Sequence, residues 1–168
     1  MARVSLLVRS MRTATDEERK EHPAGLLAEH HRDLDRRLDE LVSRAQECDV
    51  TELRCQWTAF ERELLRHLEL EEAEILPGFA QHDAAGARAI LADHAEIRSE
   101  LLEMGVSLDL HLLRAEAVEG FVRRLKAHAR REEAALYAWA EHHFGTGRWS
   151  SIKRSLADAA GARRASDD

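Results

Sequence analysis

Histidine and glutamate occur together at helical spacing in two places along the sequence. His67 is followed four residues later by Glu71, and His128 is followed four residues later by Glu132. Residues four apart lie on one face of an α-helix, with about 5–6 Å between their Cβ atoms. Imidazole nitrogens and carboxylate oxygens are common donors to divalent transition metals. Each pair can therefore bind one metal centre from a single helix.

Two further histidines, His31 and His94, occupy comparable positions in other segments. Each of the four histidines interrupts an apolar row in which the spacing alternates between four and three residues. Such a row is typical of the helix face that is turned toward the interior of a bundle. The four predicted inward-facing rows are Leu27, His31, Leu34, Leu38 and Leu41; Leu53, Trp57, Phe60, Leu64, His67 and Glu71; Ile90, His94, Ile97, Leu101 and Met104; and Val118, Phe121, Leu125, His128, Glu132, Ala135 and Trp139.

Burying these six polar side chains without a compensating charge would be costly. An isolated buried charge costs several kcal/mol even after relaxation, whereas a domain has a net stability of only about 5–15 kcal/mol. Four neutral imidazoles and two carboxylates form a donor set for two divalent transition metals, with the glutamates as bridges. The rows contain no cysteine, which disfavours a structural zinc site or an iron–sulfur cluster. The alternative is a metal-free bundle whose HxxxE pairs merely have the spacing of surface salt bridges.

The composition predicts that helices position these residues. Hydrophobic residues make up 44% and charged residues 34% of the 168 residues, with two prolines and eight glycines, which favours an all-α fold of long amphipathic helices. We expect an antiparallel up-down four-helix bundle, because four helices with short connections pack in this way. The helices are predicted at 23–46, 51–76, 84–104 and 109–143, followed by a short C-terminal helix at 149–160. Breaks are predicted at Cys48–Thr51, Pro77-Gly78, Gly105–Ser107 and Phe144–Gly147, with Asp83 as a helix cap.

The two halves of the predicted bundle resemble each other. The segment 60–73 is similar to 121–134, and the pattern that follows His31 is similar to the pattern that follows His94. A bundle of two related helix pairs has an approximate two-fold axis, where a paired site can form. The predicted organisation is an N-terminal tail at 1–20, the bundle at 21–146, and a short helix with a C-terminal tail at 147–168.

Charge and hydropathy exclude several classes of function. The formal net charge is −7, from 32 acidic and 25 basic residues that are interspersed, which argues against nucleic-acid binding. No apolar run approaches the roughly 20 residues that span a bilayer. The run Val4–Val8 is too short for a secretory signal. Cys48 and Cys55 do not form a CxxC motif, and we interpret both as reduced thiols of a cytoplasmic protein.

The combined pattern H…HxxxE…H…HxxxE resembles the hemerythrin-like family, also called HHE cation-binding domains, from about Gly25 to about Phe144. The segments that carry the resemblance are HHRDLDRRL, HLELEEAEILP, DHAEIRSEL and HARREEAALY. The resemblance implies two non-haem iron ions with an oxo or hydroxo bridge, although other divalent metals can compete for such donors. It implies that one iron is held by His31 and His67, the other by His94 and His128, and that Glu71 and Glu132 bridge them.

Family members bind or react with oxygen, peroxide or nitric oxide, or sense oxygen or iron, so the resemblance implies one of these small ligands. The sequence departs from the oxygen carriers of the family at two places. Ile90 stands where the carriers have a further histidine, and the last motif is HxxxE instead of HxxxxD. One iron would then lack a protein ligand, which favours consumption of peroxide or nitric oxide over reversible oxygen storage. The alternatives are an oxygen or iron sensing or storage module, and iron delivery to damaged iron–sulfur proteins, both without turnover.

Other polar residues near the motifs receive different interpretations. His30 lies off the inward-facing row, so we expect it to be solvated or to contact a ligand from outside. Glu72 and Glu133 are expected to face outward or to orient ligands by hydrogen bonds. Glu74 is a candidate substitute ligand. Tyr137 follows His128 by nine residues, which places it on the opposite face of a regular helix, and it is assigned no role.

Overall fold

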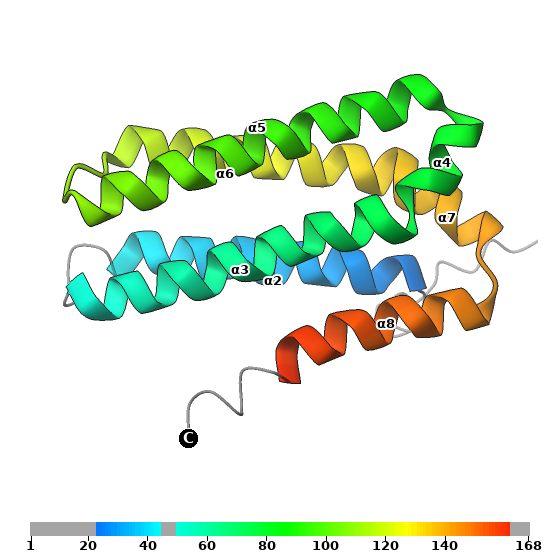
Figure 1. Cartoon of the computed structure of the whole chain (residues 1–168), viewed down its shortest axis with the longest axis horizontal. Helices are drawn as coiled ribbons and strands as arrows, with labels where there is room; N and C mark the ends of the chain where they lie inside the picture. The colour runs from blue at the N-terminus through cyan, green and yellow to red at the C-terminus, as the bar shows by residue number, and fades with distance from the viewer. Residues whose placement is uncertain (1–22, 45–49, 162–168) are drawn as a thin grey trace, which may run out of the picture.

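Four long helical segments run up and down beside one another in the computed structural model, which describes residues 23–44 and 50–161 (Figure 1). The fourth segment consists of three consecutive helices. Within the bundle, α2 packs against α3 and α6, and α5 packs against α3 and α6. The predicted all-α bundle is therefore confirmed. The four segments are α2 (Pro23–Arg44), α3 (Val50–Glu74), α5 (Ala84–Asp109), and α6 (Ala115–Arg131) continued by η1 (Glu132–Tyr137) and α7 (Ala138–His143).

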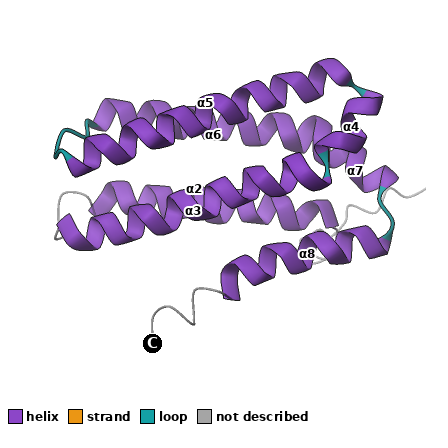
Figure 2. Ribbon diagram, viewed as in Figure 1, coloured by secondary structure: helices purple, strands orange, loops and turns teal. Residues whose placement is uncertain are grey.

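Two shorter helices complete the described part of the chain. Helix α4 (Leu76–His82) joins α3 to α5 at one end of the bundle, and α8 (Thr146–Gly161) runs back along α3 (Figure 2). Trp149 and Ile152 of α8 are buried. The predicted C-terminal helix is thus present and begins before the expected Trp149. None of the described helices has the length and apolar content needed to cross a membrane.

Two of the predicted breaks are wrong. Pro77-Gly78 does not end a helix, because α3 already ends at Glu74 and Pro77 lies in the first turn of α4. Proline fits there since the first amides of a helix have no intrahelical partner. The predicted turn at Gly105–Ser107 is part of α5. A Cβ on Gly105 would lie 3.3 Å from Nε1 of Trp57, so this glycine permits a close helix contact.

Other predicted boundaries have mixed outcomes. The Asp83 cap is confirmed, because its carboxylate accepts hydrogen bonds from the amides of Ala85 and Gly86 at 3.1 and 2.9 Å. The fourth helix begins at Ala115 instead of Asp109, after a connection in which His111 has a φ of 59°.

Cys55 is a free, exposed thiol. The predicted tails at 1–20 and after 161, the end of the first helix at Gln46, and Cys48 lie outside the described residues.

The apolar core forms two clusters along the bundle axis. One cluster lies toward the connection between α5 and α6, and the other lies toward α4 and α8. On each long segment, the predicted polar residues occur between a member of one cluster and a member of the other. The flanking pairs are Leu34 and Leu27 on α2, Leu64 and Ile75 on or just after α3, Ile97 and Ile90 on α5, and Leu125 and Leu136 on α6 and η1.

The inward-facing row of the last helical segment shifts by one residue after Glu132. The sequence pattern predicts Ala135 and Trp139 as the next buried positions, but both are only half-buried. Leu136 and Ala140 are fully buried instead. The cause is η1, a π-helical turn, because its i→i+5 hydrogen bonds accommodate one more residue per turn than an α-helix.

Close packing at Gly78 of α4 gives a stability prediction. A Cβ at this position would lie 2.7 Å from Cη2 of Trp139 in α7. We expect Gly78→Ala to displace the indole ring and lower the free energy of unfolding by about 1–3 kcal/mol, as overpacking does elsewhere. A urea titration measures the loss. Gly147→Ala is the control, because nothing lies within 4 Å of the added Cβ; equal losses in both variants would contradict the described packing.

Candidate metal centre

All six predicted polar side chains come together in the middle of the bundle. None of them is more than 8% exposed. Helix α2 supplies one histidine, α3 a histidine and a glutamate, α5 and α6 one histidine each, and η1 a glutamate at its first position. Their helices converge because apolar residues on both sides of each polar position pack into the two core clusters. The six residues are His31, His67, Glu71, His94, His128 and Glu132.

The donor atoms divide into two groups of four, and the atoms of each group lie within 4.8 Å of one another. Each group contains two histidines and both glutamates. Since Glu71 and Glu132 belong to both groups, each carboxylate can face two ions at once. The first group is His31, His67, Glu71 and Glu132, and the second is Glu71, His94, His128 and Glu132.

Donor spacings in the first group suit a single ion. Nε2 of His31 lies 2.8 Å from Nε2 of His67 and 3.2 Å from Oε2 of Glu132. Nε2 of His67 lies 3.4 Å from Oε1 of Glu71. Neighbouring donors at metal bonds of about 2.0–2.2 Å are separated by about 3 Å when the bonds are perpendicular. The four side chains could therefore surround one small cation.

The second group has similar spacings. Oε1 of Glu132 lies 3.1 Å from Nε2 of both His94 and His128. Oε2 of Glu71 lies 3.6 Å from Nε2 of His94, and this buried oxygen makes no hydrogen bond to any residue that the structure describes. A buried carboxylate oxygen without a partner is costly. A cation between the groups would remove this cost, so the residues fit a metal pair.

The second ring nitrogen of the α5 and α6 histidines contacts carboxylates outside the six. Nδ1 of His94 lies 2.8 Å from Oε1 of Glu72, whose carboxylate is also bound by Arg98 at 2.7 and 3.1 Å. Nδ1 of His128 lies 3.4 Å from Oδ2 of Asp93. These contacts fix the ring orientation and leave Nε2 directed at the centre, as occurs at many histidine metal sites.

The other two histidines also have outer contacts at Nδ1, but the contact of His31 is longer than a hydrogen bond. Nδ1 of His31 lies 3.6 Å from Oε1 of Glu133. Nδ1 of His67 lies 3.1 Å from Nδ1 of His30, whose Nε2 lies 3.4 Å from Oε1 of Glu63. His30 and Glu133 therefore contact ligand candidates from outside, as expected. Asp93, Arg98 and Glu63 were not singled out from the sequence, because nothing distinguishes them from the other charged residues of the helix surfaces.

Burial and neighbouring charges shift the pKa values of the cluster residues in opposite directions. Burial, together with the Glu132 carboxylate, raises the pKa of Glu71 well above its ordinary value. Burial also tends to raise the pKa of Glu132. The imidazoles of His128, His31 and His94 have the larger, opposite effect and hold the pKa of Glu132 well below its ordinary value. Burial lowers the pKa of His31, yet the facing carboxylates of Glu132 and Glu133 raise it to about 9. Metal ions compete with protons for such donors.

Comparison with known proteins identifies the family of the chain. The family model described as hemerythrin HHE cation binding domain matches residues 22–140. The chain belongs to the hemerythrin HHE cation-binding family. No curated protein and no solved structure gives a significant match. The matched hemerythrin region includes all six polar residues of the cluster, so the chain is a hemerythrin-like cation-binding domain with a His/Glu cluster that could bind metal.

Tyr137 lies inside the hemerythrin cluster, and its predicted position on the opposite helix face is wrong. The side chain is 2% exposed. Its hydroxyl donates to Oε1 of Glu71 and lies 3.1 Å from Nε2 of His31. The prediction assumed a regular α-helix from His128 onward, whereas the π-helical turn rotates the residues after Glu132. Only the presence of a single tyrosine close to the second HxxxE motif could have drawn attention to it.

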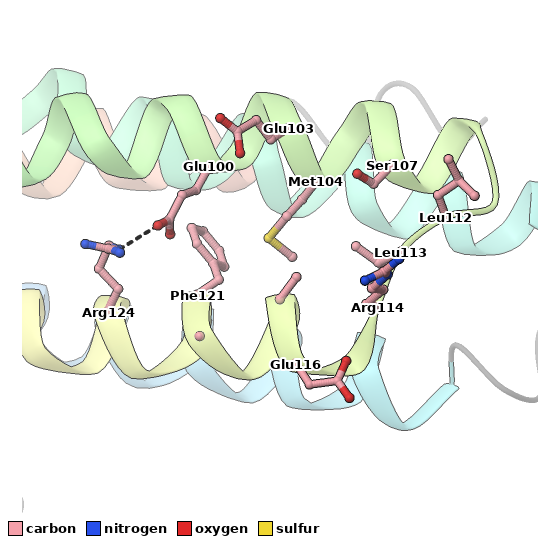
Figure 3. A pocket seen from close by; sticks show the side chains of 12 residues that line it. Glu100, Glu103, Met104, Ser107, Leu112, Leu113, Arg114, Glu116, Phe121 and Arg124 are labelled. Atoms are coloured by element: carbon pink, nitrogen blue, oxygen red, sulfur yellow. Dashed lines mark ion pairs between the residues drawn. The ribbon is translucent and has the colours of Figure 1, made fainter.

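Two features of the hemerythrin-like domain lie away from the cluster. Glu74 is not part of either donor group; its Oε2 lies 3.8 Å from Nη2 of Arg148 in α8, so it is no substitute ligand in this structure. A groove of about 450 Å³ lies between α5 and α6, where Arg124 pairs with Glu100 at 2.8 Å (Figure 3). None of the six cluster residues lines this groove.

The contact between Glu72 and His94 gives a prediction for the hemerythrin site. We expect Glu72→Ala to lower metal affinity about 10- to 100-fold, because removing such an outer partner frees the ligand ring. Titration with a metal and a competing chelator measures the affinity. Glu74→Ala is the matched control, since Glu74 is on the same helix and contacts Arg148. Equal affinities for Glu72→Ala and the unmodified chain would show that the contact does not orient His94.

Proposed function

We propose that this hemerythrin-like domain is a non-haem di-iron protein that reacts with peroxide, oxygen or nitric oxide. The observation that carries the proposal is the sharing of Glu71 and Glu132 by two adjacent donor groups. Because both groups contain these two carboxylates, two bound ions would lie next to each other as a pair and not in two separate sites. In this assignment His31 and His67 hold one ion, and His94 and His128 hold the other.

The donor types and the family favour iron. Mixed imidazole and carboxylate donors suit first-row transition metals, and zinc or copper can compete where the supply allows. Bound iron would supply Lewis-acid and redox chemistry at a site from which bulk water is largely excluded. The protein's own contribution is to orient the imidazoles of His67, His94 and His128 through hydrogen bonds at Nδ1 and to keep the two carboxylates between the groups.

Burial of the cluster supports a small reactant. The six side chains are at most 8% exposed, so the site suits a molecule of two or a few atoms. Ile90 is 1% exposed at the position where the oxygen carriers of the family have an additional histidine. The second group therefore has four protein donors, and a position is left for an exogenous ligand. This supports turnover of peroxide or nitric oxide in preference to reversible oxygen storage.

Addition of peroxide to the iron-loaded protein tests the proposed reactivity. We expect peroxide to be consumed over many equivalents, with oxygen release if the reaction is a disproportionation. Nitric oxide is tested separately by its disappearance in the presence of a reductant. Zinc-loaded protein is the control, because zinc occupies similar donors without redox chemistry. A stable, reversible spectral change with oxygen and no consumption of either reactant would indicate a carrier or sensor instead.

A further inference from the structure

The hydroxyl of Tyr137 lies among the donor atoms of the first group. It donates to Oε1 of Glu71 and lies 3.1 Å from Nε2 of His31 and 3.5 Å from Nε2 of His67. These are three of the four donors of that group. The distances to the histidines fall close to those between the donors themselves, which are 2.8, 3.2 and 3.4 Å. The phenol oxygen therefore stands where a further ligand of the same ion would stand.

We propose that the phenolate oxygen of Tyr137 is a fifth protein ligand of the ion held by His31 and His67. This inference rests on the proposed metal pair and adds a residue to its ligand set. Ligation breaks the phenol O–H bond: the oxygen keeps the electron pair and shares it with the ion, and the proton leaves to solvent. The first ion then has two nitrogen and three oxygen ligands from the protein.

The hydroxyl makes more polar contacts than its hydrogen bond to Glu71. Its oxygen also faces Nε2 of His31 and of His67. Nδ1 of His67 contacts His30, and Nδ1 of His31 faces Glu133, so Nε2 is the metal-directed nitrogen of both rings. The phenol shares the side of these rings on which an ion would be bound.

The backbone of η1 brings the tyrosine to the site. Tyr137 follows Glu132 by five residues, and both are fully or nearly fully buried at opposite ends of the same π-helical turn. Residues five apart are close on one face in a π-helix because its hydrogen bonds join residues i and i+5. The turn therefore directs a carboxylate and a phenol from one short segment toward the same cluster. Such π-helical turns are frequent at functional sites.

The internal repeat shows that the other ion has no equivalent ligand. In the aligned halves, the segment Glu132–Tyr137 (EEAALY) corresponds to Glu71–Leu76 (EEAEIL). In this alignment the tyrosine corresponds to Leu76, which is buried and apolar. The two ions would thus have five and four protein donors. It follows that the position open to peroxide, oxygen or nitric oxide lies on the ion held by His94 and His128.

The experiment uses the fact that Tyr137 is the only tyrosine of the chain. In the iron(III)-loaded protein we expect a visible phenolate-to-iron charge-transfer band and, on excitation into it, resonance-Raman modes of a tyrosinate ring. Zinc loading should give the ultraviolet difference spectrum of one tyrosinate. In Tyr137→Phe, all three signals should disappear while about two ions per chain remain bound, because the six other ligands are intact.

A matched control places a tyrosine elsewhere in the same background. Phe144 is half-buried after α7 and is not part of either donor group. The double variant Tyr137→Phe, Phe144→Tyr restores the tyrosine count and should not restore the band. Wild-type protein that binds two irons without a tyrosinate signal would overturn the ligand assignment and leave the proposed function standing. Wild-type protein that binds no metal would overturn both.

Discussion

Glu132→Ala is expected to abolish metal binding at both positions, because its carboxylate belongs to both donor groups. Each group would retain three donors, and the imidazoles of His31, His94 and His128 would lose the carboxylate that they face. We expect the metal content to fall from about two ions per chain to well below one. A variant at a histidine of one group, such as His67→Ala, should affect the two positions unequally.

The rise in melting temperature on adding metal is a more sensitive test of this variant than its metal content. A ligand at 100 times its dissociation constant stabilises the folded state by about 2.7 kcal/mol per site. In a domain of this size, 1 kcal/mol corresponds to about 2–4 °C in melting temperature. Adding metal should therefore raise the melting temperature of the unmodified chain by about 10–20 °C for two sites. The increase should nearly vanish in Glu132→Ala and in the size-conserving Glu132→Gln.

Glu119→Ala is the matched control for this measurement. Glu119 lies on α6, is largely exposed, and contacts Arg123 at 3.7 Å. Its replacement should leave the metal content and the metal-induced rise in melting temperature unchanged. If Glu132→Ala also retained both, the carboxylate would not be a bridging ligand, and the assignment of the two donor groups would be wrong.

Removal of metal from the unmodified protein is the second change with a large expected effect. Six buried ionisable groups then lose the positive charge that compensates them, and this lowers the stability of the folded state. The reference is protein with free metal at 100 times its dissociation constant. Relative to it, we expect chelation of two sites to lower the free energy of unfolding by about 5 kcal/mol. Denaturant titrations of the loaded and the chelated protein measure this difference.

The chelated protein also distinguishes a metal site from a purely structural polar cluster. If the cluster is self-sufficient through contacts such as Glu132 with His94 and His128, chelation should change the stability very little. If it is a metal site, adding iron or zinc back should restore the stability with a stoichiometry of two. A stability that is insensitive to both treatments would show that the cluster is not a metal site.

The sequence predicted the fold and the composition of the cluster because both depend on helical periodicity. Each inward-facing row combined apolar residues with one histidine, and a helical bundle buries such rows in its interior. The rows of α2, α3 and α5 are buried as expected, including His31, His67 and His94. The connection near Asp83 was also predictable, since a carboxylate before a helix can accept its first amide hydrogens.

Errors arose where one residue type can serve two structural purposes. The sequence predicts a turn at Gly105, but this glycine allows α5 to pack closely against Trp57. The sequence predicts a helix end at Pro77, but this proline lies in the first turn of α4. The position of Tyr137 depends on a π-helical turn, which leaves no compositional signature in EEAALY. The outer contacts of Asp93 depend on the relative rotation of α5 and α6, which a single sequence does not specify.

The iron content of the folded protein tests the proposed metal pair. Protein loaded anaerobically with iron(II), freed of unbound metal and analysed for iron per chain should contain about two ions, since there are two donor groups. Glu132→Ala, treated identically, should contain far less than one. We expect two ions in the unmodified chain and their loss in the variant. A content of zero, or of one ion that is unaffected by Glu132→Ala, would contradict the proposed metal pair.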